Sequence, residues 1–158
     1  LEDAELGWKL RLLGCDIQYV PASRVFHQYQ FNSNFTWYYY LERNRLWLLA
    51  TYYRWPTLVL LAPAILLMEL GQLAFAARVG RLRDKLRCWG FFLSPANLKR
   101  LRAHRSSVQN ARLCGDRDLV TRFTGRIESP ELNNPLIRWV ANPLPSTYWQ
   151  IAPRLIVW

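Results

Sequence analysis

The sequence predicts a mostly α-helical fold, with a small α/β unit at the N-terminal end and long, partly membrane-associated amphipathic helices behind it. Apolar residues recur at the spacing of one helix face through most of the 158 residues. One stretch of 21 residues, 57–77, is almost wholly apolar. Lys and Arg outnumber Asp and Glu by 21 to 11, which gives a net charge of +10. Such a charge favours an anionic partner, which nucleic acid, an anionic lipid surface or a phosphorylated substrate would each provide.

The aromatic residues bear on the choice of anionic partner, and the cysteines bear on the redox compartment. Eight Trp and eight Tyr favour the lipid surface, because both residue types concentrate at membrane–water interfaces. The three cysteines, Cys15, Cys88 and Cys114, are odd in number and form no metal-binding spacing, so we expect free thiols in a reducing compartment. The chain begins at Leu1 rather than at a methionine, and we expect it to be the C-terminal piece of a longer polypeptide.

The first segment, residues 1–31, combines one helix with two extended runs. Residues 2–13 carry leucines at helical spacing and three acids in the first turn, where the helix dipole favours negative charge. Gly14 suits the residue that ends a helix. The runs 17–20 and 24–27 predict two short strands separated by a turn. We therefore expect this segment to be the α/β unit.

The second segment, residues 32–55, predicts one long helix rich in Tyr and Arg. Three residues suited to helix capping, 32–34, precede it, and the helix is expected from about residue 35 to residue 53. Pro56 follows shortly afterwards. Because proline is favoured in the first turn of a helix, we expect a new helix to begin there.

The third segment, residues 56–80, contains the apolar stretch. A helix of 21 residues is about 31 Å long, enough to span the hydrocarbon core of a bilayer. Pro63 and Glu69 lie inside it, and a charge at the bilayer centre costs about 2.5–3.5 kcal/mol. Residues 81–126 hold twelve Lys or Arg against three Asp, and arginines also precede the stretch. Since both flanks are basic, a re-entrant or interface-lying element fits better than a single crossing. A buried core helix is the alternative.

The fourth segment, residues 81–126, predicts basic amphipathic helices. In the first of them, apolar residues at helical spacing alternate with basic ones. The apolar positions are Leu82, Leu86, Trp89 and Leu93, and the basic positions are Arg81, Arg83, Lys85 and Arg87. Such a helix suits an anionic membrane surface.

Ser94 and Pro95 form an N-cap and first-turn pair, which predicts a second helix up to about Leu113. Its basic residues are expected to be exposed: Lys99, Arg102, Arg105 and Arg112. A third, short helix is expected over 117–124, after Gly115. Nucleic-acid binding is the rival interpretation of these arginines, and no aromatic strand motif, zinc pattern or recognition helix supports it.

The last segment, residues 127–158, is rich in proline and tryptophan. Trp139, Trp149 and Trp158 lie about ten residues apart. The segment is too apolar for a disordered tail in solvent. It is expected either to dock at a membrane interface or to pack on a further domain of the polypeptide.

Five residues are candidates for chemistry, and each has an ordinary interpretation as well. Glu2 and Asp3 could place a general base at a helix start, or could simply compensate the helix dipole. His27 could ligate a metal or pack as a hydrogen-bonded core residue. Arg43 and Arg45 could bind a diphosphate or form a solvated helix face. Residue types alone do not decide between these readings.

The order and spacing of the whole set resemble the end of the catalytic domain of family 2 glycosyltransferases, the inverting enzymes of GT-A fold that include bacterial rhamnosyltransferase-like and other polysaccharide-building enzymes. The helix at 38–49 looks like the one that follows in many members, and 108–123 is similar to C-terminal extensions. The matching residues are Glu2-Asp3, Glu5 to Arg11, Gly14, Tyr19-Val20-Pro21, Arg24-Val25 and His27.

The resemblance implies roles for the candidate residues. In that family the aspartate of the Glu-Asp pair is the catalytic base, which places the base at Asp3 with Glu2 in support. A histidine at the position of His27 ligates, in several members, the divalent metal (Mg²⁺ or Mn²⁺) on the donor diphosphate. Arg43 and Arg45 fall near the QxxRW motif of processive members and are candidate diphosphate contacts. The sequence there departs from QxxRW, which disfavours a processive synthase.

The resemblance further implies a hexosyltransferase that uses a nucleotide-sugar donor and a lipid-linked or glycan acceptor, for cell-envelope polysaccharide or glycolipid synthesis. It implies a location at the cytoplasmic face of the bacterial inner membrane, on an anionic lipid surface and without nucleic acid. The family's donor-binding strands and DxD motif lie upstream of the matched motifs and would supply most of the metal ligands. This chain alone is therefore expected to be inactive. The alternatives are a non-enzymatic membrane-anchoring adaptor and a nucleic-acid-binding module.

Overall fold

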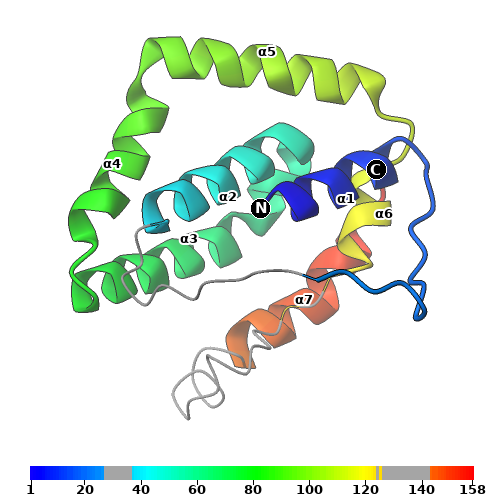
Figure 1. Ribbon diagram of the computed structural model, residues 1–158, viewed down its shortest axis with the longest axis horizontal. Helices are drawn as coiled ribbons and strands as arrows, with labels where there is room; N and C mark the ends of the chain where they lie inside the picture. Colours follow the sequence, from blue (N-terminus) through cyan, green and yellow to red (C-terminus); the bar gives the residue numbers. More distant parts are fainter. Residues whose placement is uncertain (27–36, 124, 126–142) are drawn as a thin grey trace.

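The computed structural model describes residues 1–26, 37–123, 125 and 143–158 (Figure 1). These residues form seven α-helices and no β-strand, so the mostly α-helical prediction is confirmed for the described part of the chain. The helices are α1 (Glu2–Leu12), α2 (Tyr38–Tyr52), α3 (Trp55–Arg78), α4 (Leu82–Leu93), α5 (Pro95–Ala111), α6 (Asp116–Val120) and α7 (Pro143–Leu155).

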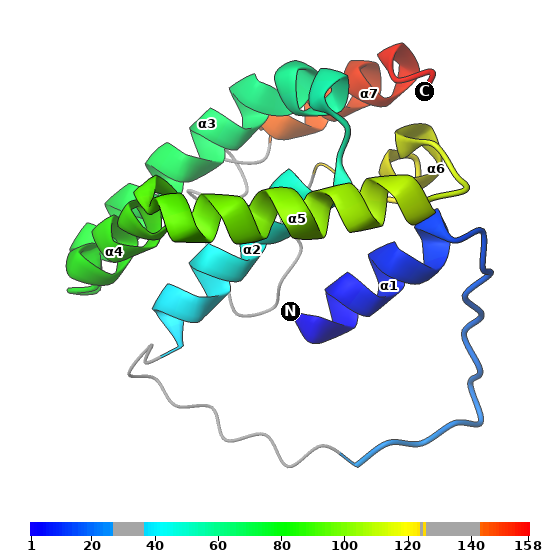
Figure 2. The same cartoon turned by 90° about the horizontal axis from the view of Figure 1, so that it is seen from above.

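Helix α2 lies at the centre of the arrangement and packs against α1, α4 and α5. Figure 2 shows α5 crossing over α2, with α1 and α3 on either side. Helix α4 joins the far end of α3 to α5, and α7 packs against α3 (Figure 1). The buried core lies around the C-terminal end of α2, where α1, α3, α6 and α7 also contribute. Its members are Leu12, Leu48, Tyr52, Tyr53, Leu61, Leu119, Val120, Ala152 and Ile156.

The two predicted strands of the N-terminal unit are wrong as far as the structure describes them. Helix α1 ends as expected, with Gly14 at a φ of 76° and the Cys15 N–H donating to the Leu10 carbonyl at 2.9 Å. The residues that follow, 17–20 and 24–26, form no strand, and Phe26 is 94% exposed. The Ile17 carbonyl accepts from Arg11 at 3.0 Å rather than from a neighbouring strand. A strand needs a neighbouring strand to satisfy its backbone groups, and the described residues supply none.

Helix α2 lies within the predicted range of 35–53, while the expected caps at 32–34 lie outside the described residues. Helix α3 begins at Trp55 with Pro56 in its first turn, as predicted, and runs through Pro63 as one helix. It is the one described helix long and apolar enough to cross a membrane. Only 6% of its most apolar window is buried, which is far less than a core helix would show.

Helices α4 and α5 begin and end close to the predicted positions, with Ser94 as the N-cap of α5. Two predictions about their basic residues are partly wrong: Lys85 was expected on a basic face suited to a membrane surface, and Arg105 and Arg112 were expected to be exposed. Lys85 is fully buried in the interior, and Arg112 is almost fully buried, with Arg105 half-buried beside it. Each of these side chains meets acids or backbone carbonyls of another helix, which a helical repeat alone does not reveal.

The C-terminal tail packs on this chain's own helices. Tyr148 in α7 donates its hydroxyl hydrogen to the Leu60 carbonyl of α3. The Trp158 indole N–H donates to the Thr57 hydroxyl at 2.7 Å. Trp139 lies outside the described residues. The described tail thus completes the core around α3.

Gly115 permits the close approach of the tail to α6. A Cβ at this position would lie 2.7 Å from the backbone carbonyl carbon of Trp158, a distance that forces the chain to move. We expect Gly115→Ala to lower the free energy of unfolding by about 1–3 kcal/mol. The matched control is Gly90→Ala in α4, where a Cβ meets nothing within 4 Å and helix propensity predicts a gain of about 0.5–1 kcal/mol. Urea denaturation followed by circular dichroism measures both, and equal effects of the two substitutions would contradict this packing.

Candidate functional site

Helix α1 is held on the helical body by one face. The Tyr52 hydroxyl donates to the Glu5 carboxylate at 3.0 Å. Trp8 packs edge-on against Tyr52, with ring centroids 5.8 Å apart, and Leu12 is buried in the core. Burial, and then the Glu5 carboxylate, raise the pKa of Tyr52 above its ordinary value, so its hydroxyl remains a neutral donor.

Asp3 lies on the other face of α1. At 100° per residue it is turned away from the side that carries Glu5, Trp8 and Leu12, and its side chain is exposed. Glu2 is also exposed. Both carboxylates of the acid pair are therefore exposed on the described part of the chain.

The described residues do not contain a complete metal site. No group of three or more His, Cys, Asp or Glu side chains that could hold an ion occurs among them. His27, the candidate ligand, lies just outside the described range.

Arg45 belongs to an ion cluster of four side chains from α2, α3 and α4. Its guanidinium donates to Glu42 at 2.9 Å and also to Glu69. Lys85 binds the same two carboxylates, with its Nζ 2.9 Å from Glu69 and in direct contact with Glu42. The Lys85 side chain is 0% exposed and that of Glu42 is 5% exposed. Two acids and two bases thus compensate one another away from water.

The cluster explains how an acid occurs in the apolar helix α3. Burial alone would raise the pKa of Glu69, but hydrogen bonds from Lys85, Trp89 and Arg45 outweigh it and hold the pKa below the ordinary value. The Trp89 indole donates to Glu69 at 2.8 Å. Burial raises the pKa of the neighbouring Cys88 thiol to about 11, so that thiol is neutral. Glu69 is therefore an ionised, fully partnered group.

Arg43 has a different environment from Arg45. Its guanidinium lies over the rings of Tyr39, Tyr40 and Phe91, at 5.6, 5.1 and 5.4 Å from their centroids. It also donates to its neighbour Asn44. No carboxylate of the described residues forms an ion pair with it. Of the two predicted diphosphate contacts, Arg43 is thus the one with an uncompensated charge, while Arg45 is bound by two acids.

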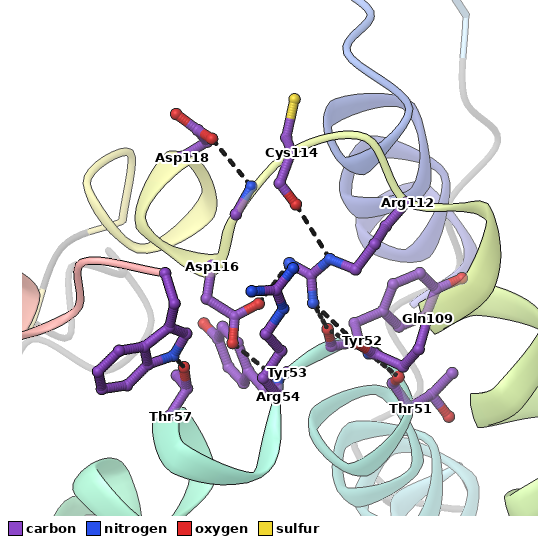
Figure 3. A network of polar contacts seen from close by, with 12 residues as sticks. Thr51, Tyr52, Tyr53, Arg54, Thr57, Gln109, Arg112, Cys114, Asp116 and Asp118 are labelled. Carbon is purple, nitrogen blue, oxygen red and sulfur yellow. Dashed lines mark hydrogen bonds and ion pairs between the residues drawn. The ribbon is translucent and has the colours of Figure 1, made fainter.

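A second polar network, shown in Figure 3, joins the end of α2 to α5 and α6. Gln109 donates to the carbonyls of Thr51 and Tyr52 at 2.9 and 3.0 Å. Arg112 binds Asp116 at 2.5 Å, and Asp116 also accepts the Arg54 backbone N–H at 2.7 Å. The last carbonyls of a helix have no partner within it, and α5 supplies donors for them.

Sequence reasoning missed this network. Arg105, Gln109 and Arg112 lie at the spacing of one helix face, i, i+4 and i+7, and that spacing was the available signal. Arg105 donates to the carbonyls of Ala50 and Tyr53. A basic stripe was expected to face an anionic partner, whereas part of it faces the negative end of another helix dipole.

Compared with known proteins, the chain matches no family model, no curated protein and no solved structure.

The ion cluster predicts a large loss of stability when Lys85 is removed. Lys85→Met leaves the buried carboxylates of Glu42 and Glu69 with Arg45 as their one remaining cation in the cluster. We therefore expect the free energy of unfolding to fall by about 3–5 kcal/mol. Lys99→Met is the matched control, because Lys99 is exposed on α5 and a change within about 0.5 kcal/mol is expected there. Urea denaturation measures both. A Lys85→Met protein as stable as the control would show that the cluster contributes little.

The lowered pKa of Glu69 predicts a dependence of stability on pH. A group with a lower pKa in the folded state contributes stability above its unfolded value, here 4.5, and loses it as the pH falls through the folded pKa. We therefore expect the stability gap between the unmodified protein and Glu69→Gln to narrow as the pH falls below 4.5. The exposed Asp3→Asn serves as control. A difference in unfolding free energy between the unmodified protein and Glu69→Gln that stays constant between pH 7 and pH 3 would contradict the lowered pKa of Glu69.

Proposed function

We propose that this chain is the C-terminal, membrane-associated part of an inverting glycosyltransferase of family 2, which transfers a sugar from a nucleotide-sugar donor to a hydroxyl of a lipid-linked or glycan acceptor. The order of motifs from Glu2-Asp3 to His27 supports the family. The single structural observation that carries the proposal is the division of α1 into two faces. One face holds the helix on α2, and the other presents Asp3 without a covering element among the described residues.

The proposed chemistry is one displacement with inversion at the anomeric carbon. The Asp3 carboxylate accepts the proton of the acceptor hydroxyl while the hydroxyl oxygen attacks that carbon. The bond to the nucleoside diphosphate breaks on the opposite side, so the sugar leaves one oxygen and joins another. A positioned general base of this kind contributes about 10²–10⁴-fold in rate.

The proposal assigns donor binding mainly to residues upstream of the matched motifs. The divalent metal belongs there as well, with His27 as the contribution from this chain. Arg43 is the better candidate for a diphosphate contact, since its charge is not paired with a carboxylate of the described residues and guanidinium matches phosphate geometry. Arg45 is instead part of the ion cluster.

The membrane part of the proposal rests on α3 and on the net charge of +10. A bacterial inner membrane presents anionic lipid to the cytoplasm, and basic segments are attracted to such a surface. Part of the basic character of α5 is used internally by Arg105 and Arg112. That use reduces the continuous basic face that a nucleic-acid binder would need.

The base assignment is tested by Asp3→Asn in the complete polypeptide. We expect the rate of sugar transfer to fall by about 10²–10⁴-fold, with the helical content unchanged because Asp3 is exposed. The control is Asp16→Asn, which removes an exposed carboxylate that pairs with Arg11 on the same segment. Transfer of radiolabelled sugar to acceptor under single-turnover conditions is the measurement.

Near-normal transfer by Asp3→Asn would remove Asp3 as the base. It would then favour a membrane-anchoring adaptor in which the N-terminal segment has no catalytic role. Equal losses in Asp3→Asn and Asp16→Asn would point to a structural effect of the segment rather than to proton transfer.

A further inference from the structure

Helix α3 presents an apolar face that the described residues leave largely exposed; at its N-terminal end the Arg105 guanidinium lies over the Trp55 ring, 4.3 Å from the centroid. Trp55, Val59, Leu66 and Leu70 are all exposed, with Val59 at 72% and Leu66 at 63%. Their spacing of four, seven and four residues places them on one side of the helix. The stripe extends for about 22 Å along the axis. An apolar surface of this length indicates a docking face rather than an ordinary surface.

The opposite side of α3 is covered by the chain's own helices. Thr57, Leu61 and Ala76 are buried there, and α4 and α7 pack against the helix. Helix α4 carries the exposed cations Arg83 and Arg87. If α3 crossed a bilayer with this packing intact, those charges would enter the hydrocarbon at about 2.5–3.5 kcal/mol each. A position in the plane of the surface avoids that cost.

Helix α4 extends the apolar face. Leu82, Leu86 and Leu93 are exposed, with Leu93 at 80%, and they share one side of α4 with Trp89. Because the Trp89 indole donates to Glu69 of α3, this side of α4 borders α3. The burial of Lys85 on the adjacent side keeps the leucines turned outward.

Cations border the apolar face. Arg83 and Arg87 are exposed on the same side of Leu86 on α4, where the Arg87 guanidinium also lies over the Tyr39 ring, 4.9 Å from its centroid, and Arg78 is exposed at the end of α3. Long basic side chains beside an apolar surface can lay their stems along it and hold the charge at the level of lipid headgroups. An apolar protein partner would not need this rim, whereas an anionic bilayer matches both the face and the charges.

We propose that α3 and α4 dock together on an anionic phospholipid bilayer, with α3 lying in the plane of the surface and its outward stripe in the acyl-chain boundary. This inference rests on the membrane association in the proposed function and specifies its geometry. The stripe is defined as Trp55, Val59, Leu66 and Leu70, and the ridge as Leu82, Leu86 and Leu93.

Vesicle binding by the 158-residue chain tests the docking face. With vesicles of phosphatidylglycerol and phosphatidylcholine, we expect the double variant Leu66→Glu/Leu70→Glu to bind at least tenfold more weakly than the unmodified chain. Leu82→Glu/Leu86→Glu tests the ridge independently and is expected to weaken binding in the same direction. The matched control is Leu113→Glu, since Leu113 is 79% exposed but lies between α5 and α6. Circular dichroism confirms that each variant is folded.

Cysteine labelling distinguishes an α3 that lies in the plane of the membrane surface from an α3 that crosses the bilayer. In a background without the native cysteines, Arg54→Cys and Arg78→Cys mark the two ends of α3. The chain is synthesised without cells in the presence of the same vesicles, and a membrane-impermeant maleimide is then added outside. We expect both positions to react, whereas protection of one of them would show a crossing helix and overturn the proposal.

Three other outcomes would also overturn it. Unchanged vesicle binding by both double variants would exclude this face. Equal binding to vesicles of phosphatidylcholine alone would remove the anionic surface as the partner. A dimer in solution that the Leu66→Glu/Leu70→Glu substitutions convert to a monomer would assign the face to a second copy of the chain. None of these results depends on sugar transfer, so failure here is distinct from failure of the Asp3 assignment.

Discussion

The compensation of charge among Glu42, Arg45, Glu69 and Lys85 is the interaction on which the arrangement of the helices depends. Each of these groups would be costly to bury alone, and together they connect α2, α3 and α4 through ion pairs. Because Lys85 must face the carboxylates of Glu42 and Glu69, only one rotation of α4 about its axis allows both ion pairs to form. That rotation turns the α4 leucines outward. The same pairs allow α3 to carry an acid close to its exposed apolar stripe.

Helix α2 connects this cluster with the N-terminal segment. Its N-terminal half supplies Glu42 and Arg45. Its C-terminal carbonyls accept hydrogen bonds from α5, and Tyr52 and Tyr53 at its end pack against Trp8 of α1. A change at one end of α2 is therefore expected to reach the other. In the proposed enzyme, this helix would fix the distance between the surface on which α3 and α4 lie and the position of Asp3. Such a link would hold the acceptor site at a constant height above the lipid.

Local signals predicted the helix boundaries well, and interactions between distant residues account for the errors. Gly14, Pro56 and the Ser94-Pro95 pair act through their own backbone conformations, so their positions alone indicated where helices end and begin. The run 17–20 has the composition of a strand, but strand formation needs a partner that composition does not provide. Lys85 was expected on a basic face at a membrane surface, and Arg112 was expected to be exposed, because a helical repeat predicts the face of a residue and not which element packs against that face. The proposed role of Asp3 came from an ordered set of motifs, and its position on the exposed face of α1 required the structure.

The ion cluster is tested most directly by a double-mutant cycle between Glu42 and Lys85. Urea denaturation of Glu42→Gln, Lys85→Met and the double variant gives the coupling energy between the two side chains, free of the cost that each substitution carries by itself. If the cluster fixes α4 on α2, the double variant should be more stable than the sum of the single effects predicts, by at least about 1 kcal/mol. Effects that add to within about 0.3–0.5 kcal/mol would show that the two groups do not depend on each other, and the account of how α4 is oriented would then be wrong.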